Sequence, residues 1–154
     1  MMIVGVFILL SALPSGWLAD HFGHKRMVML SGLLAALGTA ITVLTTSLSV
    51  IYVGGCLIGI ATGFFFTSNW ALGTRLVPKA EAGRYLGLSN LAGAGAGAVG
   101  GYIGGPIADF FTAQFPAIPG LGYVLLFTLY GVMFLLSVVA LAGVHTPALQ
   151  EAQP

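Results

Sequence analysis

The stretch GWLADHFGHKR, residues 16–26, decides how the rest of this chain is interpreted. The chain has only five basic and four acidic residues, and three of these charges, Asp20, Lys25 and Arg26, fall in this window with two of the three histidines. Apolar residues run up to the window from the N-terminus and resume at Met27. A short polar segment between two apolar runs is where a membrane protein reverses direction.

The composition is that of a membrane protein. Of the 154 residues, 58% are hydrophobic and 6% are charged, and the mean hydropathy is +1.02. Soluble globular domains carry about 25% charged residues, so a soluble chain of this length could not bury so much apolar surface. The net charge of +1, with no basic run beyond Lys25-Arg26, gives no reason to expect a nucleic-acid partner. The single cysteine, Cys56, lies in an apolar stretch, where a thiol packs as a small hydrophobic group.

Apolar runs of transmembrane length predict five helices, because a bilayer core takes roughly 20 residues of helix. The first run could also be a signal peptide, but no lysine or arginine precedes it and its cleavage pattern is poor, so we interpret it as a transmembrane helix. We expect a single membrane domain over residues 1–154. The predicted spans are residues 1–18, 27–46, 50–73, 85–109 and 122–144.

The basic residues predict the orientation of the chain. All five fall in the first and third connections between the predicted spans, which lie on the same side of the membrane. By the positive-inside rule, that side is the cytoplasm. We therefore expect an integral, multi-pass protein of the cell or inner membrane, with its C-terminal tail, VHTPALQEAQP, in the cytoplasm.

Glycines recur every four residues in the third and fourth predicted spans, which places them on one stripe of each helix. Such stripes let helix backbones approach closely in lipid, so we expect them to be packing surfaces. The sequence GAGAVG, residues 95–100, matches a dinucleotide-binding pattern, but it lies inside a predicted span and follows no strand, so we expect no cofactor. The packing glycines are Gly55, Gly59 and Gly63 in the third span and Gly93, Gly97, Gly101 and Gly105 in the fourth.

The opening stretch resembles the loop signature of the major facilitator superfamily, G-x-L-x-D-x-x-G-R/H-R/K-R/K. The residues on signature positions are Gly16, Leu18, Asp20, Gly23, His24, Lys25 and Arg26. The sequence RLVPKAEAGRYLGLSN, residues 75–90, resembles that family's cytoplasmic loop and the start of the helix after it. Together with the helix spacing, the resemblance covers nearly the whole chain.

The resemblance implies an all-α fold of twelve membrane helices in two six-helix halves, with the signature loop between the second and third helices of each half. Five helices with the loop after the first then correspond to helices eight to twelve or to helices two to six. We favour eight to twelve, because the third span lacks an early arginine and the chain ends in a short polar tail. The sequence GYIGGPIAD, residues 101–109, argues for the other assignment, since it partly resembles a Gly-Pro motif of helix five in antiporters. On either assignment we expect a fragment of a half-bundle.

The resemblance also implies secondary active transport of a small solute by alternating access. We expect the chain to need the lipid bilayer, a small-molecule substrate, and the remaining helices of the transporter or a partner chain that supplies them. No spaced Ser-His-Asp set, metal-ligand cluster or pair of carboxylates indicates catalysis or a metal site. The alternative class is a non-transporting scaffold or assembly subunit, which would not need an aspartate and a basic pair at this spacing. The sequence leaves the substrate class open.

The first group of candidate functional residues is a conformational-switch loop. We expect a latch in which Asp20 faces a helix N-terminus or Arg75 and so holds one access state, because a carboxylate at the membrane border needs a compensating partner. The loop residues are Gly16, Asp20, Gly23, Lys25, Arg26 and Arg75.

The second group is a substrate pathway. Polar residues inside spanning helices tend to face the bundle interior, so Asn69 and Asn90 are expected to bond a solute or a neighbouring helix, with a bond to nearby backbone as the alternative. The predicted pathway residues are Asn69, Trp70, Asn90 and Tyr102. Asp109, at the outer end of the fourth span, is expected to be an interfacial group and not an ion-coupling carboxylate.

Overall fold

The computed structural model describes residues 2–76 and 81–144, which form five α-helices and, within those residues, no strand. The all-α expectation is therefore confirmed. The helices are α1 (Met2–Phe22), α2 (His24–Val43), α3 (Leu48–Leu76), α4 (Ala82–Gln114) and α5 (Leu121–Ala142).

Four of the five helices, α1, α2, α3 and α5, are long and apolar enough to cross a membrane. The fourth helix, α4, has 33 residues but is not among them. Its middle is the run from Leu91 to Gly105, in which glycine and alanine alternate with few larger apolar residues. Because glycine adds length without adding apolar side-chain surface, α4 is long but less hydrophobic than its neighbours.

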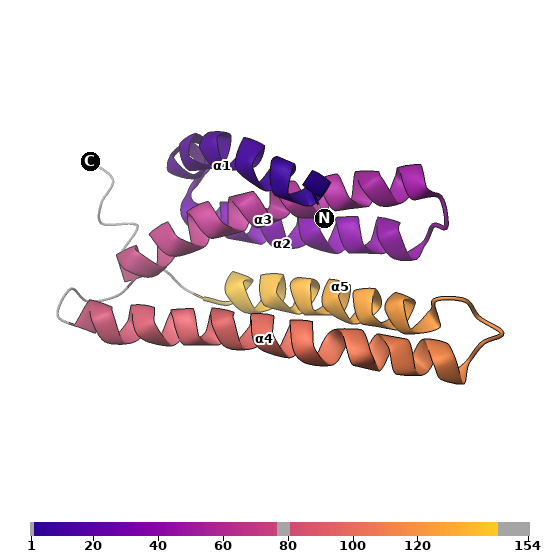
Figure 1. The fold of residues 1–154 in the computed structure, drawn as a ribbon. Helices are drawn as coiled ribbons and strands as arrows, with labels where there is room; N and C mark the ends of the chain where they lie inside the picture. The colour runs from indigo at the N-terminus through magenta and orange to yellow at the C-terminus, as the bar shows by residue number, and fades with distance from the viewer. Residues whose placement is uncertain (1, 77–80, 145–154) are drawn as a thin grey trace.

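The helices form a row in space that differs from their order in the chain. The third helix packs against both α1 and α2, α2 packs against α5, and α5 packs against α4. Figure 1 shows the result, with α1, α2 and α3 in one layer and α4 and α5 beside it. The described part of α4 has only weak contact with α3, so one long side of α4 faces away from its own bundle.

Close backbone contacts hold α3 against its two neighbours. A methyl group on Gly59 would lie 2.8 Å from the carbonyl oxygen of Val4, and one on Gly63 would lie 2.8 Å from the carbonyl oxygen of Ile8. Gly55 lies in looser contact with α1. All three glycines of α3 thus lie toward α1, where small residues allow two helices to touch through their backbones.

A different stripe on α4 faces α5. Gly104 and Ala108 lie against α5: the Tyr130 hydroxyl is 2.8 Å from where a methyl group on Gly104 would be, and a methyl group on Gly122 would overlap the Ala108 carbonyl. Thr112, four residues further on, accepts a hydrogen bond from the Gly122 amide at 3.1 Å. At the predicted stripe of Gly93, Gly97, Gly101 and Gly105, no atom of the described residues lies within 4 Å of where a Cβ would be, so the described part of the chain shows no packing role for it.

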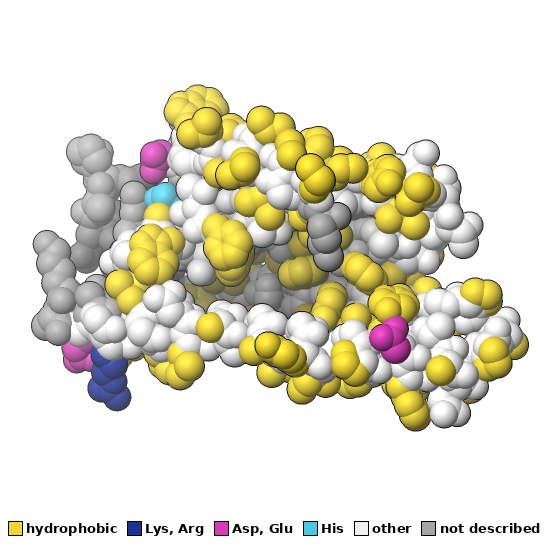
Figure 2. All heavy atoms as spheres, viewed as in Figure 1, with side chains coloured by type: hydrophobic (Ala, Val, Ile, Leu, Met, Phe, Trp, Pro, Cys, Tyr) yellow, Lys and Arg dark blue, Asp and Glu magenta, His cyan; other side chains and the backbone are white. Residues whose placement is uncertain are grey.

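The buried residues are small and the large apolar side chains face outward. Among the described residues the buried side chains are mostly those of alanine, serine and threonine, with Met27, Leu72 and His24 as larger exceptions, whereas many leucine, phenylalanine and tryptophan side chains are exposed. Figure 2 shows this apolar exterior over both layers. A soluble protein buries its large apolar residues, so the pattern indicates that lipid surrounds these helices.

Candidate functional site

The signature loop is a connection of one residue. α1 ends at Phe22 and α2 begins at His24, so only Gly23 separates them. Its φ of +92° lies in a region that residues with a Cβ rarely adopt, which explains why glycine stands here. The two helices are therefore joined by a sharp corner, and the charged residues of the loop belong to the helix ends.

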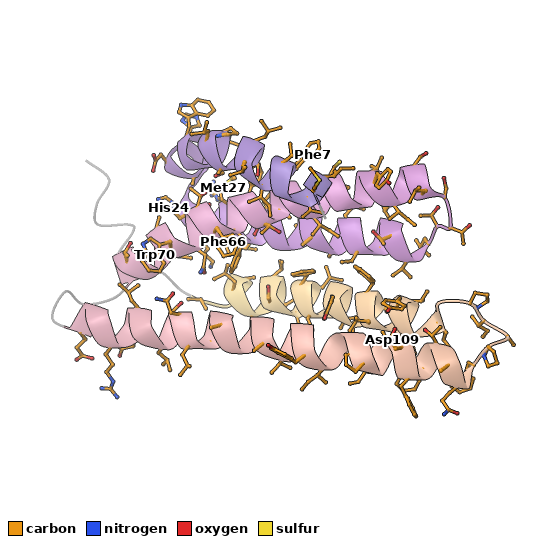
Figure 3. All side chains as sticks on the ribbon, viewed as in Figure 1. Phe7, His24, Met27, Phe66, Trp70 and Asp109 are labelled. Atoms are coloured by element: carbon orange, nitrogen blue, oxygen red, sulfur yellow. The ribbon has the colours of Figure 1, made fainter. Side chains whose placement is uncertain are left out.

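Asp20 and His24 face each other across that corner. The Asp20 Oδ1 lies 3.6 Å from the His24 Nε2, with 72% of the aspartate side chain exposed and 6% of the histidine side chain. His24 is held inside the bundle close to the buried Met27, as Figure 3 shows. The sequence identified His24 only as a variant at a position where arginine is common, so its burial is a finding of the structure.

Lys25 reaches the far end of the chain. Its Nζ donates hydrogen bonds to the carbonyl oxygens of Val144, at 2.6 Å, and Ala142, at 3.3 Å. These carbonyls lie at the C-terminus of α5, where the last turn of a helix leaves carbonyl groups without partners and carries partial negative charge. The lysine of the signature loop is thus a cap for α5.

The remaining loop residues are placed as follows. Gly16 faces α3, with the Thr67 side chain 3.9 Å from where its Cβ would be. Arg26 is exposed near the start of α2. The backbone of Arg75 belongs to α3, but its side chain lies outside the described residues, so the predicted pairing of Asp20 with Arg75 stays a prediction.

A cleft of about 460 Å³ lies between α3 and α4. It contains three of the four predicted pathway residues, Asn69 and Trp70 from α3 and Asn90 from α4. The face in Figure 2 is hollowed between these two helices, and Figure 3 shows Phe66 and Trp70 on the part of α3 that borders the hollow. The other lining residues are Phe65, Phe66, Ser89, Ala92, Gly93 and Ala94.

The chemistry of the cleft is polar but uncharged. Neither Asn69 nor Asn90 makes a side-chain hydrogen bond to any described residue, so both amides are available to a ligand, as is the Ser89 hydroxyl. An amide offers both donors and an acceptor, which suits a partner that also has both, such as a hydroxyl group. The exposed Trp70 ring supplies a flat apolar surface beside these groups.

Two predicted residues lie elsewhere. Tyr102 is 84% exposed on α4 and does not line the cleft. Asp109 lies on α4, toward the end of the bundle opposite to Trp70 (Figure 3). Its Oδ1 accepts a hydrogen bond from the Tyr123 hydroxyl at 2.5 Å. Among the described residues, no group of histidine, cysteine and carboxylate side chains could hold a metal ion.

The comparisons with known proteins agree with this geometry. The fold is that of a polytopic membrane protein. The family model of the Major Facilitator Superfamily matches residues 1–154, and the chain belongs to that superfamily. This superfamily consists of membrane transport proteins and not of enzymes.

Two transporters are similar to parts of the chain. One is the solute carrier family 2, facilitated glucose transporter member 12, of Danio rerio, which is 30% identical over 83 residues, or 54% of this chain and 13% of the relative. The other is the minor myo-inositol transporter IolF of Bacillus subtilis, which is 33% identical over 88 residues, or 57% of this chain and 20% of the relative. The alignments thus span a fifth or less of each relative's length. No solved structure matches the chain significantly.

Proposed function

We propose that this chain is part of a secondary active transporter that moves an uncharged, polyhydroxylated small solute by alternating access. The observation that supports this is the cleft between α3 and α4, in which Asn69, Trp70 and Asn90 come together. Asn69 and Trp70 are adjacent residues of α3, whereas Asn90 belongs to α4. A movement of α4 relative to α3 would therefore change how many of these groups a solute can touch at once.

The solute class follows from the lining of the cleft. None of the described residues that line it has a charged side chain, so neither an anion nor a cation would gain an ion pair with them. Two amides and a hydroxyl can bond vicinal hydroxyl groups, and the faces of Trp70 and Phe66 can cover the C–H face of a ring. The names of the two relatives, a glucose transporter and a myo-inositol transporter, agree with such a solute.

The chain would act as one portion of a larger bundle. We propose that its helices correspond to helices eight to twelve of the family fold, and that further helices, in the same protein or in a partner chain, complete the pathway. The stripe of Gly93, Gly97, Gly101 and Gly105 on α4 contacts none of the described residues, which supports the proposal that a further helix packs there. On this proposal the end of α5 that Lys25 caps lies at the cytoplasmic side, because Lys25, Arg26 and Arg84 gather there.

The signature loop would serve as the switch. Asp20 lies beside His24 at the corner between α1 and α2, and Lys25 holds the end of α5. We propose that these contacts stabilise one access state and separate in the other. The loop would then act by its electrostatic bonds to helix ends and not by contact with the solute.

Cysteine labelling tests the cleft. The native Cys56 is first replaced by alanine, and single cysteines are introduced at Asn69, at Asn90 and, as a control, at Leu91, which is exposed on α4 but does not line the cleft. We expect a water-soluble thiol reagent to modify the first two sites in membranes, and glucose or myo-inositol to slow that modification. The control site should be unreactive, because lipid covers it.

The proposal would be wrong if neither asparagine position reacted, or if both reacted at rates that no concentration of either solute changed. Circular dichroism and membrane insertion of each variant show whether the fold is retained. Transport measured in cells that lack their own sugar and inositol uptake then gives the second readout, since Asn69→Ala and Asn90→Ala should lower uptake and Leu91→Ala should not.

A further inference from the structure

A second cavity lies beside the α3–α4 cleft. It has a volume of about 320 Å³ and is enclosed by α2, α3 and α5. Three hydroxyl side chains line it, one from each helix: Ser31 from α2, Thr62 from α3 and Ser137 from α5. Gly32 of α2 also lines it, and α5 lies close to this glycine. A methyl group at Gly32 would lie 3.5 Å from the Phe134 carbonyl oxygen and 3.8 Å from the Ser137 Oγ.

The hydroxyl groups are arranged as hydrogen-bond acceptors. The Ser31 hydroxyl donates to the Val28 carbonyl oxygen at 2.7 Å, and the Thr62 hydroxyl donates to the Ile58 carbonyl oxygen at 2.7 Å. Each oxygen keeps lone pairs for a further partner. Ser137 makes no side-chain hydrogen bond to a described residue and can both donate and accept. No described residue with a charged side chain lines the cavity, and apart from the three hydroxyl groups its lining is apolar.

One side chain separates the two spaces. Phe65 lines both the cleft and the second cavity, whereas its neighbour Phe66 lines only the cleft. The two rings meet edge to face with their centroids 5.9 Å apart. Phe65 is 41% exposed, so its ring is not part of a filled core and lies between the two open spaces that it lines. Because Phe65 borders both spaces, its ring is placed to control passage between them, and exposed side chains change rotamer rapidly.

We propose that the cavity between α2, α3 and α5, which we name the hydroxyl chamber, is a second compartment for an uncharged hydroxylated solute, entered from the α3–α4 cleft past Phe65. This inference rests on the proposed function. The solute's hydroxyl groups donate to Ser31 and Thr62 and exchange hydrogen bonds with Ser137. The Phe65 ring sets the size of solute that passes from one compartment to the other.

Accessibility at Ser137 tests the chamber and its entrance. Ser137→Cys is made in the Cys56→Ala background, with Leu136→Cys as the matched control, since Leu136 is the adjacent residue of α5, is exposed and does not line the chamber. We expect a water-soluble thiol reagent to reach Ser137→Cys and not Leu136→Cys. Added Phe65→Ala should speed the reaction, and added Phe65→Trp should slow it, so that the two rates differ by roughly tenfold, a change of about 1.4 kcal/mol in the barrier to entry. Leu91→Ala, which changes a residue that lines neither space, should leave the rate at Ser137→Cys unchanged.

Protection by solute tests what the chamber holds. We expect glucose or myo-inositol to slow the reaction at Ser137→Cys, and Thr62→Val to weaken that protection because valine keeps the shape of threonine and removes the hydroxyl. If Phe65→Ala does not fold, the comparison of wild type with Phe65→Trp still gives the dependence on ring size.

The outcomes separate this inference from the function of the cleft. An unreactive Ser137→Cys, as expected if a lipid chain fills the chamber, overturns the inference. A reaction rate that is the same with Phe65→Trp and Phe65→Ala, or that no solute slows, overturns it as well. In each case protection at Asn69 and Asn90 would still support solute binding in the cleft, and loss of protection there alone would contradict the proposed function.

Discussion

The Lys25 ammonium and the Val144 carbonyl oxygen are 2.6 Å apart, although 119 residues separate them in the sequence. This bond connects the start of the second helix to the end of the fifth. The same ammonium also bonds the Ala142 carbonyl, so a single flexible side chain holds the last turn of α5. A residue that the sequence placed in a switch loop thus also determines how a distant helix ends.

Replacing Lys25 by alanine should loosen the end of α5. A cation at a helix C-terminus contributes roughly 0.3–1 kcal/mol, so the global stability should fall by no more than that. Backbone amides in the last turn of α5 should exchange hydrogen several times faster, which mass spectrometry of the detergent-solubilised chain would measure. Lys25→Arg keeps the charge and the donors and should restore slow exchange. Equal exchange in the alanine variant and the parent chain would contradict the capping role.

Replacing Gly23 by alanine should destabilise the corner between α1 and α2. A side chain at φ +92° costs on the order of 1–2 kcal/mol, because the Cβ approaches a carbonyl oxygen. We expect a lower unfolding midpoint in a titration from mild detergent into sodium dodecyl sulfate. Gly87→Ala is the control: no described atom lies within 4 Å of a Cβ there, and alanine favours a helix interior by roughly 0.5–1 kcal/mol over glycine. A Gly23→Ala chain as stable as the parent would show that the corner relaxes at no cost.

Glycines at the contact between α4 and α5 and glycines on the open face of α4 should respond in opposite ways to substitution by alanine. Gly122→Ala would force α5 away from the Ala108 carbonyl, and overpacking of this kind costs roughly 1–3 kcal/mol. Gly97→Ala meets nothing in this chain and should stabilise the isolated chain slightly, through helix propensity. Unfolding in detergent measures both. If a further helix of the full transporter packs on this face, Gly97→Ala should instead weaken the association of that helix with α4. The opposite sign of the effect would distinguish the full transporter from the isolated chain.

Asp20→Asn should lower transport in the assembled protein without preventing membrane insertion. The amide keeps the size of the carboxylate but loses the charge that interacts with His24, 3.6 Å away. We expect uptake to fall several-fold while the amount of protein in the membrane is unchanged. Uptake equal to that of the parent protein would remove the latch from the mechanism.

Asp109→Asn should leave the pH dependence of transport unchanged. The carboxylate accepts a hydrogen bond from the exposed Tyr123 hydroxyl near the end of α4 and the start of α5, which is a structural contact between neighbouring helices. Tyr123→Phe removes the same contact without altering a carboxylate and should match Asp109→Asn in stability. A flattened pH profile in Asp109→Asn alone would make Asp109 the coupling residue.

The sequence predicted the helical class well because long apolar runs and glycine spacing are local properties. The grouping of Asn69, Trp70 and Asn90 could also be expected, since polar residues in spanning helices avoid lipid. The sequence could not predict which stripe of α4 packs on α5. Gly100 and Gly101 differ by only 100° around the helix, and glycine fits either face. The burial of His24 and the bond from Lys25 to Val144 depend on tertiary packing across the whole chain and leave no local pattern.

The single-residue link at Gly23 makes the first two helices mechanically continuous. The Cα atoms of Phe22 and His24 are two virtual bonds apart, and at about 3.8 Å each they can never separate by more than roughly 7.6 Å. Any sideways displacement of this end of α1 must therefore move the first turn of α2, and Lys25 transmits that displacement to the last turn of α5. The three helices are thus connected end to end. The reach of the lysine side chain limits how far this end of α1 can be displaced before α5 moves with it or the hydrogen bond to Val144 breaks.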